Sequence, residues 1–99
     1  MHIYTKKQKY AIVYILMQII EADTIIHDKE IEYMNSILKQ FAFTTQDVEY
    51  IEELELSYCM DIVKEMQQEQ KNAAIEMFRA MISIDGRIDP REVAVIDGL

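Results

Sequence analysis

The sequence predicts an all-α fold: a compact bundle of five to six helices in a single domain over residues 1–99. Three observations predict this class. The chain has only two glycines and one proline, too few for the frequent turns of a β-sandwich or barrel. Apolar residues recur at helical spacing through most of the chain. Their 51% share is enough to bury a core without disulfides or structural metal.

Capping residues and apolar spacing predict the individual helices in order. The first is expected over about 5–22, with Thr5 as its N-cap and apolar residues on nearly every side, which is typical of a central helix. The second, over about 28–40, has one apolar face. Thr44 is the expected N-cap of a third helix, with Asp47 three residues later.

The second half of the chain is predicted to contain the remaining helices. A short helix is expected after Ser57, and a long one from about 68 to 84. Pro90 is favourable at the first position of a last helix, with Asp89 as its N-cap. The spacing predicts the following buried residues: Ile12, Leu16, Ile20, Ile26, Met34, Met77, Phe78, Met81 and Ile88.

The chain contains an internal repeat. Residues 8–37 align without a gap on residues 70–99, and each copy reads as a long helix, an acidic turn, a short isoleucine stretch and a capped helix. The matched pairs are Gln8 with Gln70, Lys9 with Lys71, Ala11 with Ala73, Ile20 with Ile82, Asp23 with Asp85, Ile26 with Ile88, and Glu30 with Glu92. The repeat predicts two similar helical hairpins related by a pseudo-two-fold axis.

The acidic turn of the second copy matches the last eight positions of an EF-hand loop. The residues at the first and third ligand positions would be Met81 and Ser83, so the leading carboxylate that calcium requires is missing. An EF-hand is therefore excluded. Helix capping explains Asp89 and Glu92, and Gly86 suits a left-handed turn.

Capping leaves the aspartates of the two turns unexplained. If the pseudo-symmetry brings the turns together, their carboxylates supply oxygen ligands for a weakly bound Mg²⁺ or Ca²⁺ ion. The predicted metal ligands are Asp23, Glu30, Asp85 and Glu92. The alternative, in which these residues only end and cap helices, stays open at this point.

The pattern Ala22-Asp23 followed by Ile26 and Glu30, and its second copy from Asp85 to Glu92, resembles the TerB-like family of tellurite-resistance and DjlA N-terminal helical domains. The resemblance covers about residues 10–99. It implies a helical bundle, a link to stress responses, and a role in binding divalent metal or in assembling partner proteins near the membrane. The chain departs from the family motif at Thr24, where glycine is usual, and at His27, where the second copy has aspartate.

The net charge of −8 opposes binding to nucleic acids and insertion into or binding to anionic membranes. No Lys or Arg occurs from Gln40 to Val63, a stretch that is rich in carboxylates. We predict that four of them form a docking surface for a basic protein partner: Asp47, Glu49, Glu52 and Glu53. The alternative is a solvated helix face without a partner.

The apolar stretch near the N-terminus does not read as a targeting segment. Gln18 interrupts it and Glu21 follows, and the lone Cys59 gives no sign of a disulfide-stabilised secreted protein. We therefore expect a cytoplasmic protein. One cysteine, two histidines and no glycine-flanked serine predict no catalytic residues and no cofactor beyond a divalent cation.

The sequence thus predicts a non-enzymatic interaction module or divalent-cation-responsive module. Two alternatives remain: a metal-dependent hydrolase-like enzyme that uses the acidic cluster, and a purely structural partner-binding adaptor of a co-chaperone.

Overall fold

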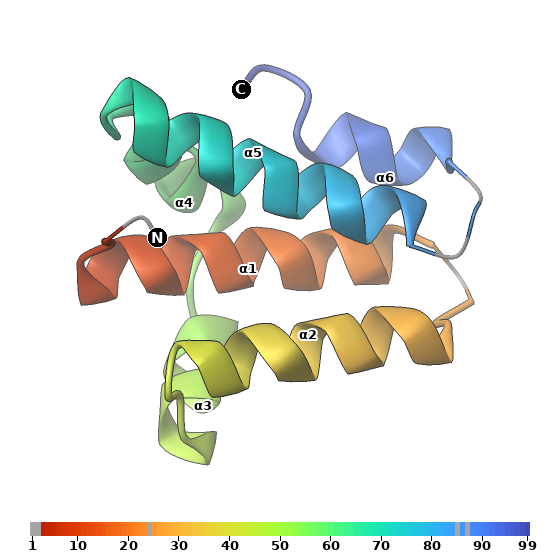
Figure 1. Ribbon diagram of the computed structural model, residues 1–99, viewed down its shortest axis with the longest axis horizontal. Helices are drawn as coiled ribbons and strands as arrows, with labels where there is room; N and C mark the ends of the chain where they lie inside the picture. Colours follow the sequence, from red (N-terminus) through yellow and green to blue (C-terminus); the bar gives the residue numbers. More distant parts are fainter. Residues whose placement is uncertain (1–2, 24, 85, 87) are drawn as a thin grey trace.

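The computed structural model describes residues 3–23, 25–84, 86 and 88–99. Within these residues the chain forms six helices and no strand, which confirms the all-α prediction (Figure 1). The helices are α1 (Lys6–Ala22), α2 (Asp28–Gln40), α3 (Thr45–Glu52), α4 (Leu56–Lys64), α5 (Gln68–Ser83) and α6 (Pro90–Val95).

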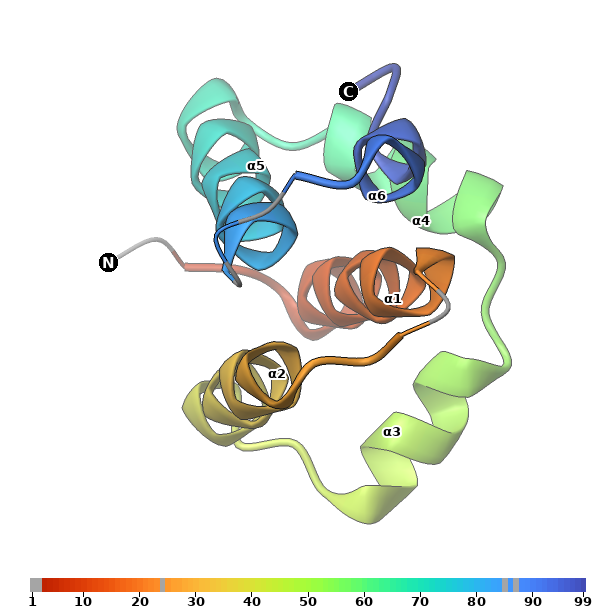
Figure 2. The same ribbon diagram turned by 90° about the vertical axis from the view of Figure 1, so that its right-hand side faces the viewer.

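Helix α1 lies in the middle of the bundle and packs against each of the other five helices (Figure 2). It has buried residues on several sides, which explains why its sequence is apolar almost all round. These residues are Ala11, Ile12, Val13, Ile15, Leu16, Ile19 and Ile20. The predicted central position of this helix is confirmed.

The helix starts follow local capping signals. The side chain of Thr5 accepts a hydrogen bond from the backbone N–H of Gln8, and Gln8 reaches back to the N–H of Thr5. Thr44 and Asp47 form the same reciprocal box at α3. The predicted N-cap Asp89 accepts a hydrogen bond from the N–H of Arg91 at α6. Gly86 has a φ of 81°, the left-handed conformation expected of it.

The arrangement of helices follows the repeat. The starts of α1 and α5 are equivalent positions of the two copies, and so are the starts of α2 and α6. Figure 1 shows α1 and α5 running in the same direction, with α2 and α6 returning in the opposite one. Helices α3 and α4 form the connection between the two copies.

Two equivalent residues meet at the end of the bundle where α1 and α5 begin. The side-chain amide Nε2 of Gln70 lies 3.4 Å from Oε1 of Gln8. The starts of α1 and α5, which are equivalent in the repeat, are therefore neighbours in the structure.

The core contains most of the predicted residues. Ile12, Leu16, Ile20, Met34, Phe78 and Met81 are buried, and Met77 is partly buried. The prediction was wrong for two residues: Ile26 is 56% exposed and Ile88 is 69% exposed. Both lie in the links that precede α2 and α6, and in the helices that follow, the first buried side chains are those of Glu30 and Glu92.

Candidate functional site

The α1–α2 turn and the α5–α6 turn lie side by side at the end of the bundle that faces the viewer in Figure 2. The guanidinium Nη2 of Arg91 is 3.1 Å from Oδ1 of Asp23, which joins the two turns directly. We call this region the acidic junction and define it by six described residues: Asp23, His27, Glu30, Asp89, Arg91 and Glu92.

Asp23 ends α1 and organises the turn that follows. Its Oδ1 accepts a hydrogen bond from the backbone N–H of Ile25 at 3.2 Å. Its Oδ2 lies 3.8 Å from Nε2 of His27, the residue that precedes α2. Together with the contact to Arg91, these interactions place the carboxylate of Asp23 between the two turns.

Arg91 also binds Asp89, with two parallel contacts. Its Nη2 donates to Oδ2 of Asp89 at 2.7 Å, and its Nε donates to Oδ1 at 3.1 Å. The hydrogen bond and negative charge of Asp89 raise the pKa of Arg91 above its usual value. Arg91 therefore compensates the charge of the two outer carboxylates, Asp23 and Asp89.

Glu30 and Glu92 form the inner part of the junction. Each occupies the third position of its helix, α2 or α6, and they are only 2% and 4% exposed. Oε1 of Glu30 accepts a hydrogen bond from the backbone N–H of His27 at 3.1 Å. In the part of the chain that the structure describes, the buried Oε2 of Glu92 has no hydrogen-bond partner.

The environment of Glu92 favours its neutral form. Burial is the main cause that raises its pKa to about 8, followed by a side-chain hydrogen bond with Glu30 and by the negative charges of Glu30, Asp23 and Asp89. Burial and the neighbouring carboxylates therefore favour the protonated form of Glu92 over the ionised one.

The predicted metal ligands can now be placed. Three of them, Asp23, Glu30 and Glu92, lie in the acidic junction, while Asp85 lies outside the described residues. Across residues 3–23, 25–84, 86 and 88–99, no group of three or more His, Cys, Asp or Glu side chains is arranged to hold a metal ion. The buried Oε2 of Glu92 is one oxygen without a hydrogen bond among the described residues, and oxygen is the donor type that hard cations prefer.

The four residues of the predicted docking surface differ in their surroundings. Glu49, Glu52 and Glu53 are exposed on and just after α3. Asp47 is instead engaged within the fold: its Oδ1 accepts a hydrogen bond from the hydroxyl of Tyr10 at 2.7 Å, and its Oδ2 accepts one from the N–H of Thr44 at 2.8 Å. These bonds, the Thr44 N–H first, lower the pKa of Asp47 to about 2.

Sequence reasoning missed the burial of the Glu30–Glu92 pair. Glutamate at the third position of a helix is a common capping residue, and capping residues are usually exposed. The signal that could have found the pair is the repeat itself, because equivalent residues next to a two-fold axis must face each other. Cys59 is buried as expected, and burial raises the pKa of its thiol to about 11.

Comparison of the chain with protein-family models, with curated proteins and with solved structures found no match. Among the helices of the described residues, none combines the length and the apolar character needed to cross a membrane.

Proposed function

We propose that this protein is a non-enzymatic interaction module whose acidic junction responds to divalent cations, in the manner that its resemblance to TerB-like domains implies. The observation that carries the proposal is the pair Glu30 and Glu92, two buried carboxyl groups in contact, one of which has an oxygen without a hydrogen-bond partner among the described residues. Buried carboxylates that are both ionised repel each other, so the pair requires a proton or another cation.

The pair links cation binding to the packing of the bundle. Glu30 belongs to α2 and Glu92 to α6, so their mutual attraction or repulsion acts on the spacing of the two helices. A divalent cation bound there would neutralise both carboxylates and release the proton of Glu92. Binding at the junction would thereby favour one arrangement of the two repeats over another.

The interacting surface that we propose is the exposed acidic face formed by Glu49, Glu52 and Glu53. Its charge suits a basic protein partner in the cytoplasm. Asp47 contributes to this surface through its position at the start of α3, but its bonds to Tyr10 and Thr44 already use both of its oxygens.

The test is a titration of the wild type and of Glu92→Gln with Mg²⁺ and with Ca²⁺. Binding is monitored by the backbone chemical shifts and by the thermal midpoint of unfolding. We expect saturable shifts at Asp23, Glu30 and Glu92 with an affinity that increases from pH 6.5 to pH 8.5, because binding competes with a proton. Glu92→Gln should lose this response. Glu32→Gln, an exposed position on the same helix as Glu30, is the matched control and should keep it.

Two outcomes would contradict the proposal. One is that millimolar Mg²⁺ and Ca²⁺ leave the shifts of the acidic junction and the thermal midpoint unchanged at both pH values. The other is that Glu32→Gln and Glu92→Gln alter the response equally, which would indicate unspecific binding of cations to an acidic protein. In either case the carboxylates of the two turns act only in capping and packing.

A further inference from the structure

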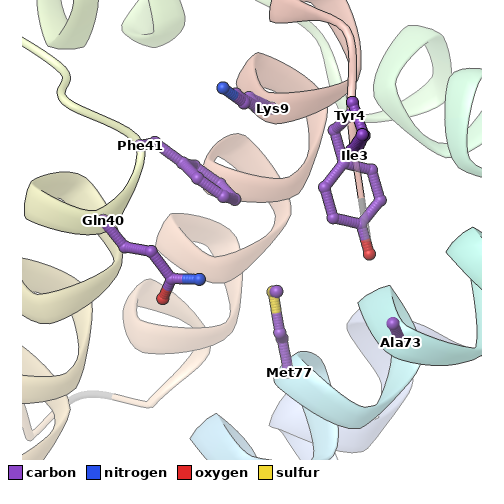
Figure 3. A pocket seen from close by; sticks show the side chains of 7 residues that line it. All are labelled: Ile3, Tyr4, Lys9, Gln40, Phe41, Ala73 and Met77. Carbon is purple, nitrogen blue, oxygen red and sulfur yellow. The ribbon is translucent and has the colours of Figure 1, made fainter. Parts of the chain in front are cut away.

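A pocket of about 380 Å³ lies at the other end of the bundle, where α1 and α5 begin and α2 ends (Figure 3). Most of its lining is apolar and comes from three separate segments of the chain: Ile3, Tyr4, Phe41, Ala73 and Met77. Lys9 and Gln40 complete the lining. Pockets of this volume with an apolar lining and a few polar groups are typical of small-molecule sites.

Hydrogen bonds and ring contacts hold the walls in place. The hydroxyl of Tyr4 donates to the backbone oxygen of Gln70 at 3.0 Å, and Nε2 of Gln70 donates to the backbone oxygen of Ile3 at 2.7 Å. The rings of Tyr4 and Phe41 meet edge to face, with centroids 6.4 Å apart. Figure 3 shows the side chain of Met77 pointing from α5 toward the space between these two rings. The pocket is therefore preformed.

Lys9 places a positive charge at the edge of this pocket. Its Nζ lies 5.6 Å from the ring centroid of Phe41. By contrast, Nζ of Lys6 is 3.7 Å from a carboxylate oxygen of Asp47. No carboxylate in the described ranges lies within ion-pair distance of Lys9, so its charge is compensated only by the ring and by solvent.

Among the described residues that line the pocket, Lys9 is the charged one, in a chain whose net charge is −8. Lys39 lies in the last turn of α2, and Lys71 in the first turn of α5, at the same end as Lys9. The N-termini of α1 and α5 bring the positive ends of two helix dipoles to this end of the bundle, and the C-terminus of α2 brings a negative one. Glu69 also lies in the first turn of α5. The charge that lines the pocket itself is that of Lys9, and an apolar ligand with a negative group is complementary to these apolar walls and this lysine.

We propose that the pocket binds a small amphipathic carboxylic acid. Its hydrocarbon chain lies between Tyr4, Phe41 and Met77, and its carboxylate accepts a charge-assisted hydrogen bond from Nζ of Lys9. This site is independent of the acidic junction and of the function proposed for it, because the two lie at opposite ends of the bundle.

The test uses octanoate as the probe and octanol as its uncharged counterpart. Titration of octanoate into the protein should give saturable shifts of the Met77 methyl group and of the Phe41 and Ala73 amides. Lys9→Gln should weaken octanoate binding about fivefold, the value of one partly exposed ion pair. Lys7→Gln is the matched control, since Nζ of Lys7 lies over the ring of Tyr58, and it should bind octanoate as the wild type does.

Two further measurements separate the contribution of the ligand's hydrocarbon chain from that of its carboxylate. Octanol should bind the wild type about as weakly as octanoate binds Lys9→Gln, because both complexes lack the charge pair. Ala73→Leu adds side-chain volume to the wall and should abolish binding of both probes, while circular dichroism shows that the helical fold is kept.

The proposal fails if octanoate causes no saturable shift at Met77 in the wild type. It also fails if octanol binds as tightly as octanoate, or if Lys7→Gln weakens binding as much as Lys9→Gln. A shift at Met77 caused by an acidic peptide with apolar side chains, but not by octanoate, would likewise overturn it in favour of a protein ligand.

Discussion

Glu30 and Glu92 occupy equivalent positions of the two repeats, both side chains are buried, and Glu30 helps to raise the pKa of Glu92. A second pair of equivalents, Gln8 and Gln70, is in contact at the other end of the bundle. Both contacts join positions that the repeat makes equivalent. Each copy thus contributes one carboxyl to the same place.

The stability of the protein should fall as the pH rises through the window set by Glu92. Its pKa is about 8 in the folded protein and near 4.5 when the chain is unfolded. Between these values the folded state holds a proton that the unfolded state has lost, so a higher pH favours unfolding, by at most about 1.4 kcal/mol per pH unit. This contribution is fully present below pH 4.5 and is lost by about pH 8.

Denaturant unfolding at several pH values between 5 and 8.5 measures this slope. Glu92→Gln should flatten it and should be the more stable protein at pH 8.5, since the amide is uncharged. The comparison of the two proteins also removes the contributions of the titratable groups that both share. If the free energy of unfolding changes with pH equally in the wild type and the variant, Glu92 does not take up the proton that this prediction assigns to it.

Removal of Arg91 should increase the affinity of the acidic junction for divalent cations. Arg91 compensates Asp23 and Asp89, so it competes with any cation that approaches these carboxylates. We expect Arg91→Gln to lower the apparent dissociation constant for Mg²⁺ about threefold. The free energy of unfolding should fall by less than about 1 kcal/mol, because the Arg91 side chain is 56% exposed. Calorimetry measures the first effect and denaturant unfolding the second.

Arg79→Gln is the control, because Arg79 forms an exposed ion pair with Glu76 on α5. It removes the same charge from the protein without touching the junction. An equal gain in Mg²⁺ affinity in both variants would mean that only the net charge matters.

Replacement of Phe78 by alanine should destabilise the protein by about 3 to 5 kcal/mol. Its side chain is completely buried, so the change leaves a cavity in the core. Ile88→Ala, at a residue that is 69% exposed, should cost less than about 1 kcal/mol. Chemical unfolding of both variants checks the contrast. A loss below 1 kcal/mol for Phe78→Ala would contradict the packing described above.

Charge reversal on the exposed acidic face should leave the fold intact. The triple variant Glu49→Lys, Glu52→Lys and Glu53→Lys alters only exposed side chains, which rarely contribute more than about 1 kcal/mol each. Asp47→Lys should destabilise the protein, because it removes the Asp47 half of the α3 capping box and the bond to Tyr10. Circular dichroism melts separate the two cases. Unfolding of the triple variant at room temperature would show that the face is structural.

The sequence by itself determined the helices of this protein. Thr5, Thr44 and Asp89 each cap the helix that they were predicted to cap, because capping involves residues only two or three positions apart. The central place of α1 also followed from its composition, since a helix that is apolar all round must be covered on all sides. The repeat indicated which helix starts are equivalent, and the structure agrees.

Only the tertiary structure decided which residues face inward at the two turns. Ile26 and Ile88 were expected in the core, but Glu30 and Glu92 are buried there instead. The side of a short link that faces the interior depends on helices distant in sequence, whose packing no local pattern encodes. The same reason applies to the pocket beside Lys9, whose walls come from the start of the chain, the end of α2 and the middle of α5.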